Sequence, residues 1–265
     1  GDPEAKTALS NIEVIHKEIE GAMYYFRYQI VENGEQLVIA TTRPETMFAD
    51  QAIFVHPDDE RYQGIIGMHA INPANGEELP IMADDYIDMS FGTAVMKCTP
   101  AHDPNDFMLA KKYDLPMPIC MNPDGTMNEL CGKYAGMDRF ACRKALVADF
   151  ESAGVVDHIE KHMHQVGHSE RTGVIVEPYL SKQWFVKMKP LADEVLKNQE
   201  IDEEKIHFFP VRFEKTFRQW LENIEDWCIS RQLWWGHRIP AWYHKATKEL
   251  YVGEQAPDDL DTWEQ

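Results

Sequence analysis

The sequence predicts an α+β fold, in which a strand-rich domain with a β-barrel core and short surrounding helices is followed by a mixed α/β tail. Three observations predict it. The first two-thirds of the chain is a series of short apolar and β-branched runs separated by Gly, Pro and Asn. Helix start signals are few in that region. The composition then changes near residue 181, where tryptophan becomes frequent and helical segments appear without a Gly/Ser linker.

Most of the expected elements in the first two-thirds are strands. The aromatic run at residues 23–31 and the run at 37–41 are joined by Asn33-Gly34, which predicts a β-hairpin. Residues 1–22 are mixed in polarity and show no clean period. Further strands are predicted at residues 52–55, 65–71, 79–83, 93–99, 119–121 and 155–166. A set of this size can form a sheet that curls into a barrel.

Two helices of this region have clear start signals. Asp103 followed by Pro104 has the form of an N-cap and a first helical residue, which predicts a helix to about residue 113. Asp138 caps a second predicted helix that runs to about residue 152 and is ended by Gly154. In the tail, the predicted helices are residues 190–197 and 217–226.

The charge balance restricts the partners. The 265 residues carry 45 Asp and Glu against 26 Lys and Arg, a net charge of −19. This argues against generic binding to a phosphate backbone, so a nucleic-acid partner would need a local basic patch or another part of a longer protein. Five scattered cysteines predict no disulfide framework and a cytoplasmic setting. No apolar run approaches the ~20 residues of a membrane span, and the N-terminal GDPEAKTALS has the features of neither a signal nor a transit peptide.

Two stretches gather polar groups where a strand ends. In GTAVMKCTPAHDPNDF, residues 92–107, a predicted strand ends at Pro100 and a helix begins after Asp103. In TTRPET, residues 41–46, an apolar strand ends in hydroxyls and an arginine. Taken alone, each stretch is also what an ordinary capped helix or capped turn looks like. A strand that runs into a helix N-terminus nevertheless suits a small polar ligand, because backbone N–H groups, hydroxyls and carboxylates converge there.

Together the two stretches resemble the editing domain of the valyl-tRNA synthetase family, as do EPYLS, QWFV, DWCISRQ and LWWGHRIP further along the chain. The resemblance covers nearly the whole chain in order, which distinguishes it from a match to one short motif. It implies a junction with a catalytic core at residues 1–22, an editing domain at 23–167 and a segment returning toward that core at 168–265. The family's HIGH and KMSKS motifs are absent. ATP and magnesium would therefore belong to a longer parent enzyme, and no cofactor is expected for the editing domain.

The resemblance also implies a function and a site. The expected reaction is hydrolysis of threonyl-tRNA(Val), so the expected partners are the acceptor end of tRNA(Val) and a threonyl ester, with a monomeric protein and no membrane. The implied catalytic residues are Asp103, Asp106, Thr99 and Lys97. Asp103 would bind the α-ammonium group, and Asp106 would bind the threonine hydroxyl. The implied substrate-binding residues line the pocket, meet the terminal adenosine or pack the threonine methyl. They are Thr41, Thr42, Arg43, Thr46 and Phe91.

Two other hypotheses come from different function classes. His158, His162, His164 and His168 fall within eleven residues, which allows a metal-dependent hydrolase. No carboxylate or cysteine with ligand spacing accompanies them, and solvent-facing histidines on an edge strand would give the same pattern. A non-catalytic module that binds acylated tRNA without turnover is the other alternative, which the acidic balance disfavours.

The sequence departs from the family pattern at two places. Ala94 stands where relatives often carry a second glycine, so the loop would shift if that position needs a positive φ. Ser169 and Thr172 stand where some relatives carry a zinc-binding Cys-x-x-Cys, so no metal is predicted there.

Overall fold

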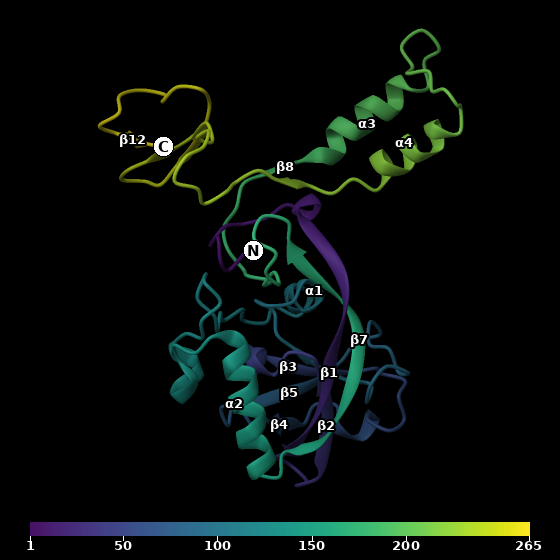
Figure 1. The fold of residues 1–265 in the computed structure, drawn as a ribbon, viewed down its shortest axis with the longest axis vertical. Helices are drawn as coiled ribbons and strands as arrows, with labels where there is room; N and C mark the ends of the chain where they lie inside the picture. Colours follow the sequence, from purple (N-terminus) through teal and green to yellow (C-terminus); the bar gives the residue numbers. More distant parts are fainter. The chain divides into compact units, whose positions relative to one another are not determined.

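The structure is a computed structural model that describes residues 1–265, and the chain divides into two compact units, Gly1–Lys182 and Gln183–Gln265 (Figure 1). The division falls close to the composition change that the sequence shows near residue 181. None of the helices has the length and apolar character needed to cross a bilayer.

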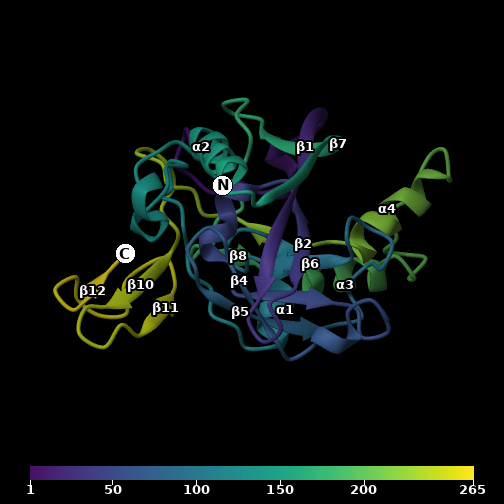
Figure 2. The same cartoon turned by 90° about the horizontal axis from the view of Figure 1, so that it is seen from below.

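The first unit is built on a seven-stranded sheet that curls into a half barrel (Figure 2). The strand order is β2-β1-β4-β5-β3-β6, and β7 pairs with β1 outside this path. The end strands β2 and β6 contact each other without a backbone ladder. The predicted α+β class with a barrel-like core is confirmed. The strands are β1 (Val14–Ile30), β2 (Gln36–Thr41), β3 (Ala52–Val55), β4 (His69–Ile71), β5 (Glu78–Ala83), β6 (Val95–Cys98) and β7 (Val156–Ser169).

Strand β1 begins nine residues before the predicted start at Met23, because β7 pairs with it along its whole first part. The antiparallel register runs from Val14 opposite Ser169 to Phe26 opposite Val156. Most side chains of this ribbon are exposed or half-buried on both faces, which explains why the sequence shows no period there. Gly21 leaves room for the His164 ring, since a Cβ at position 21 would lie 2.6 Å from His164 Cε1.

The core lies inside the curled sheet and under helix α2 (Arg139–Ser152). Asp138 caps this helix as predicted, with its side chain accepting from the backbone N–H groups of Phe140 and Ala141. Phe150 of the helix meets Phe26 of the sheet edge-on, with ring centroids 5.0 Å apart. Strand β3 is buried on both faces. Its residues 53 and 55 join the main core, and residues 52 and 54 pack with helix α1 (Pro104–Lys112) in a second cluster.

Short 3-10 turns connect these elements: η1 (Asn11–Glu13), η2 (Pro44–Ala49), η3 (Gln63–Ile65) and η4 (Glu129–Tyr134). Two strand predictions were wrong in extent. Only residues 69–71 of the predicted strand at 65–71 form a strand, because η3 occupies its start. The predicted strand at 119–121 is reduced to an isolated bridge between Met121 and Met127.

The second unit contains the mixed α/β elements that the sequence predicts for the tail (Figure 1). Helix α3 (Met188–Asn198) packs against α4 (Phe213–Glu222), which lies four residues earlier in the sequence than predicted. Strand β8 (Phe185–Val186) pairs with β9 (Trp227–Cys228). The remaining sheet has the order β11-β10-β12 and comprises β10 (Ala241–His244), β11 (Leu250–Val252) and β12 (Trp263–Glu264).

Candidate functional site

The two polar stretches come together at one end of the half barrel. TTRPET leaves β2 and enters η2, whereas Lys97 and Thr99 lie at the end of β6. Strand β6 pairs antiparallel with β3, and Lys97 lies opposite Ile53. The two stretches touch directly, since Lys97 Nζ donates to Thr46 Oγ1 at 2.9 Å. The fold therefore brings together residues that lie about fifty positions apart in the sequence.

Lys97 is the centre of a buried hydrogen-bond cluster. Its ammonium donates to Thr46 Oγ1, to Asp50 Oδ1 at 2.8 Å and to Thr99 Oγ1 at 2.6 Å. Thr99 Oγ1 in turn donates to Asp50 Oδ1 at 2.5 Å. An ammonium has three hydrogens, so all of them are directed at the protein. In this arrangement the lysine holds the side chains of Thr46, Asp50 and Thr99 in place, and its predicted contact with the substrate stays a prediction.

Asp50 is the residue of this cluster that the sequence analysis missed. It is fully buried at the end of η2, and burial raises the pKa of its carboxyl while the Lys97 charge opposes that rise. The signal that could have found it is a lone carboxylate after the apolar residues Met47, Phe48 and Ala49, on the same stretch as TTRPET. An acidic residue in a buried run needs a partner, and Lys97 supplies it.

The predicted pair of carboxylates lies on the first turn of α1. Asp103 is the N-cap, and its Oδ1 accepts from the N–H of Asn105 at 2.8 Å and of Asp106 at 3.2 Å. Asp106 Oδ2 accepts from the N–H of Thr99 at 2.8 Å, which ties the helix to the end of β6. The second oxygen of each carboxylate accepts no hydrogen bond from the chain. Burial, followed by the negative charge of Asp103, raises the pKa of Asp106 to about 7.

Arg43 and His102 connect this site to the segment that follows β7. Arg43 Nη1 donates to the His102 carbonyl at 2.7 Å, and its Nη2 is ion-paired with Glu177. Burial and the Arg43 charge lower the pKa of His102 to about 4, so the ring is neutral at physiological pH. His102 Nε2 accepts from the N–H of Cys120 at 3.0 Å, which leaves Nδ1 to donate to the carbonyl of Pro178 at 3.2 Å. This histidine is a structural residue.

The remaining predicted residues surround the cluster in different ways. Thr41 is buried and its Oγ1 accepts from the N–H of Arg43 at 3.0 Å, whereas Thr42 is half-buried. Phe91 lies in the loop before β6 and is 60 % exposed, the most exposed of the predicted residues. Ala94 does adopt a positive φ of 60°, so an alanine occupies the left-handed region at the position where the resemblance led us to expect glycine.

The histidines of β7 do not form a metal site. His158 stacks on Tyr25 at 4.0 Å and contacts Asp157 and Glu160, and His162 stacks on His164 at 5.1 Å. Nowhere in residues 1–265 do three or more His, Cys, Asp or Glu side chains gather in an arrangement that could hold a metal ion.

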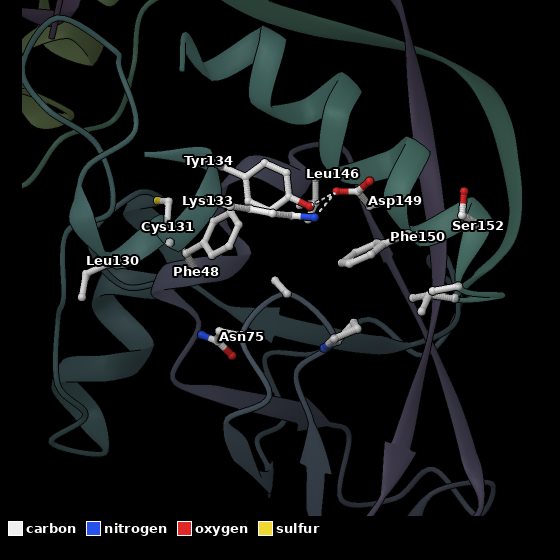
Figure 3. A pocket seen from close by; sticks show the side chains of 15 residues that line it. Phe48, Asn75, Leu130, Cys131, Lys133, Tyr134, Leu146, Asp149, Phe150 and Ser152 are labelled. Carbon is white, nitrogen blue, oxygen red and sulfur yellow. Dashed lines mark hydrogen bonds and ion pairs between the residues drawn. The ribbon is translucent and has the colours of Figure 1, made fainter. Parts of the chain in front are cut away.

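A separate hollow of about 780 Å³ lies against α2 and η4 (Figure 3). It is lined by Phe48 and Tyr134, whose rings are 5.6 Å apart, and by Phe150. Lys133 Nζ pairs with Asp149 at 2.9 Å at its rim. None of the predicted site residues lines this hollow, so it is distinct from the polar cluster.

Comparison with known proteins decides the family. Residues 2–263 match the family model for tRNA synthetases class I (I, L, M and V). The chain belongs to this family. It is 60 % identical over 264 residues to the valine–tRNA ligase of Bacillus cereus and 61 % identical over 264 residues to that of Enterococcus faecalis. In both cases the match covers all of this chain and 30 % of the relative, so the chain spans about a third of the curated relatives it matches.

These matches confirm the resemblance to valyl-tRNA synthetases that the motifs indicated. A solved structure, the ternary complex of Agrobacterium radiobacter K84 agnB2 LeuRS with tRNA and LeuAMS, is 16 % identical to the chain with a TM-score of 0.42. That alignment covers 89 % of this chain and 24 % of the LeuRS chain.

Proposed function

We propose that this chain is the editing domain of a valyl-tRNA synthetase and hydrolyses the threonyl ester of tRNA(Val). The observation that carries the proposal is the pair of open carboxylate oxygens on the first turn of α1, beside the Lys97 cluster. A threonyl ester carries two donors close together, its α-ammonium and its hydroxyl. Two neighbouring acceptors match that pattern.

Each carboxylate takes one of these donors. Asp103 is half-buried at the helix start and accepts from the α-ammonium, while Asp106, 8 % exposed, accepts from the threonine hydroxyl. An approaching ammonium favours the ionised form of Asp106, because opposite charge lowers a carboxyl pKa. Valine has nearly the shape of threonine but leaves Asp106 unpaired, which costs about 1–3 kcal/mol. An apolar pocket rejects an added hydroxyl only weakly, so a second, polar site is the physical remedy.

The reaction itself needs little from the protein. Water adds to the ester carbonyl, the bond to the ribose oxygen breaks, and threonine and free tRNA leave. Aminoacyl esters are already activated, so holding the ester and the water in place supplies much of the rate. Thr41 and Thr42 line the wall in this proposal, Phe91 packs the methyl group, and Arg43 faces the terminal adenosine. No cofactor is proposed for this step.

The activity of the longer protein is part of the proposal. Its relatives are valine–tRNA ligases. We place the chain within an enzyme that joins valine to tRNA(Val) with ATP and magnesium, in the cytoplasm and as a monomer. The acceptor end of tRNA(Val) is the partner that must reach Asp103 and Asp106.

Deacylation assays test the proposal. Threonyl-tRNA(Val) and valyl-tRNA(Val) are incubated with the wild-type protein, Asp103→Ala and Asp106→Ala. We expect selective loss of the threonyl ester, abolished by Asp103→Ala and made unselective by Asp106→Ala. An absence of turnover together with failure to bind a non-hydrolysable threonyl-adenosine analogue would refute it. Tight binding without turnover would favour the acyl-tRNA-binding module, and activity lost on chelation and restored by a metal would favour the metal-dependent hydrolase.

A further inference from the structure

The buried carboxylate of Asp50 lies beneath the proposed site and has no role in the reaction described above. Its Oδ1 accepts from Lys97 Nζ at 2.8 Å and from Thr99 Oγ1 at 2.5 Å. Its Oδ2 is buried without a hydrogen-bond partner. Desolvating a carboxylate is costly, and one ion pair offsets that cost only in part.

The direction of each hydrogen bond in the cluster follows from the chemistry of the groups. An ammonium only donates and a carboxylate only accepts, so Lys97 donates to all three of its neighbours. The Thr99 hydroxyl, which accepts from Lys97, must donate its one hydrogen to Asp50. The Thr46 hydroxyl likewise accepts from Lys97 and donates to the carbonyl of Arg43 at 2.9 Å. Every N–H and O–H hydrogen of these side chains therefore ends on an acceptor within the chain.

Around Lys97 and Thr99, the atoms left for a ligand are all of one kind. The open polar atoms beside the cluster are the second oxygens of Asp103 and Asp106, which accept when ionised. Asp50 maintains this state by taking one hydrogen from Lys97 and one from Thr99. Without its carboxylate, both side chains would have a hydrogen to offer a ligand.

We propose that Asp50 is a positioning residue that keeps the hydrogens of Lys97 and Thr99 turned away from the ligand, so that the acceptors of Asp103 and Asp106 select an amino acid whose side chain itself donates a hydrogen bond. The inference rests on the proposed function and specifies its substrate class. A hydroxyl satisfies the open acceptor. A methoxy group, which has an acceptor and no donor, meets only lone pairs and is rejected as valine is.

Binding of non-hydrolysable amide analogues of aminoacyl-adenosine tests this by calorimetry on the 265-residue chain. The threonyl, O-methylthreonyl and valyl analogues are compared at about pH 8.5, above the pKa of about 7 at Asp106. The wild-type protein is expected to bind the threonyl analogue roughly 5- to 150-fold more tightly than either of the others, the range for one buried acceptor left unpaired.

Two substitutions at Asp50 separate positioning from bulk stability. Asp50→Ala frees one hydrogen of Lys97 and one of Thr99 to bind a ligand. The ratio of affinities for the threonyl and O-methylthreonyl analogues is therefore expected to fall below about threefold, while the preference for the threonyl over the valyl analogue persists. Asp50→Asn keeps an amide oxygen that accepts both hydrogen bonds, so both preferences are retained. If Asp50→Ala does not fold, Asp50→Ala with Lys97→Met removes the two buried charges together and leaves the Thr99 hydroxyl free to donate.

The outcomes are distinguishable. Equal weakening of all three analogues in both single variants, with unchanged ratios, would mean that Asp50 acts only on stability and would overturn the inference. Wild-type protein that binds O-methylthreonyl clearly better than valyl would overturn it as well. Wild-type protein that binds none of the analogues would refute the proposed function itself.

Discussion

Replacing Asp106 by asparagine should change how the stability of the first unit depends on pH. Burial, together with the charge of Asp103, raises the pKa of Asp106 from 3.8 to about 7. The backbone N–H of Thr99, which Asp106 accepts at 2.8 Å, still finds an amide oxygen in the Asp106→Asn variant. The substitution therefore removes the titration and keeps the hydrogen bond.

The sign of the effect follows from proton binding. Between pH 3.8 and about 7 the folded protein keeps a proton on Asp106 that the unfolded chain has released. The contribution of Asp106 to the free energy of unfolding is therefore fully present below pH 3.8 and is lost as the pH rises through about 7. A pKa raised from 3.8 to about 7 corresponds to about 4 kcal/mol. Relative to wild type, Asp106→Asn should gain up to about 4 kcal/mol of stability from about pH 4 to about pH 8.

The assay must report on the first unit. All seven tryptophans lie beyond residue 183, so tryptophan fluorescence would follow the other unit. Hydrogen exchange of peptides from β3 and β6, measured across a urea series at both pH values, gives the free energy of unfolding where Asp106 acts. Asp85→Asn, at an exposed carboxylate, is the matched control and should show no pH-dependent difference. A wild-type to variant difference that is the same at both pH values would show that Asp106 titrates normally.

Three further substitutions probe the buried contacts. Lys97→Met leaves a buried carboxylate without its counter-charge and should cost about 3–5 kcal/mol in the same hydrogen-exchange assay, whereas a smaller loss would mean that the carboxylate takes up a proton. Arg143→Met removes two hydrogen bonds, at 2.8 and 2.7 Å, from the fully buried Glu45 and should destabilise the contact of η2 with α2 by a similar amount in urea unfolding followed by circular dichroism. Gly21→Ala places a methyl 2.6 Å from His164 Cε1 and should lower stability by about 1–3 kcal/mol, with recovery when His164→Ala is added; no recovery would locate the strain elsewhere.

Local signals in the sequence were sufficient for much of the fold. Asp103 and Asp138 cap the helices they were predicted to cap, because an N-cap depends only on the side chain and the next three backbone N–H groups. The motif pair TTRPET and TPAHDPNDF predicted two polar stretches at strand ends, and the fold brings these stretches into contact. The family, too, was evident from these residues and was confirmed by the comparisons.

Only the tertiary structure decided which polar groups are joined. Asp50 lies 47 residues before Lys97 and 49 before Thr99. The pairing of β3 with β6 brings these side chains within hydrogen-bond distance, and no local sequence pattern predicts that contact. The start of β1 at Val14 is likewise set by a partner strand more than 140 residues away. Caps and periods are properties of neighbours along the chain, whereas burial, charge pairing and the pKa of Asp106 arise only where distant segments exclude water together.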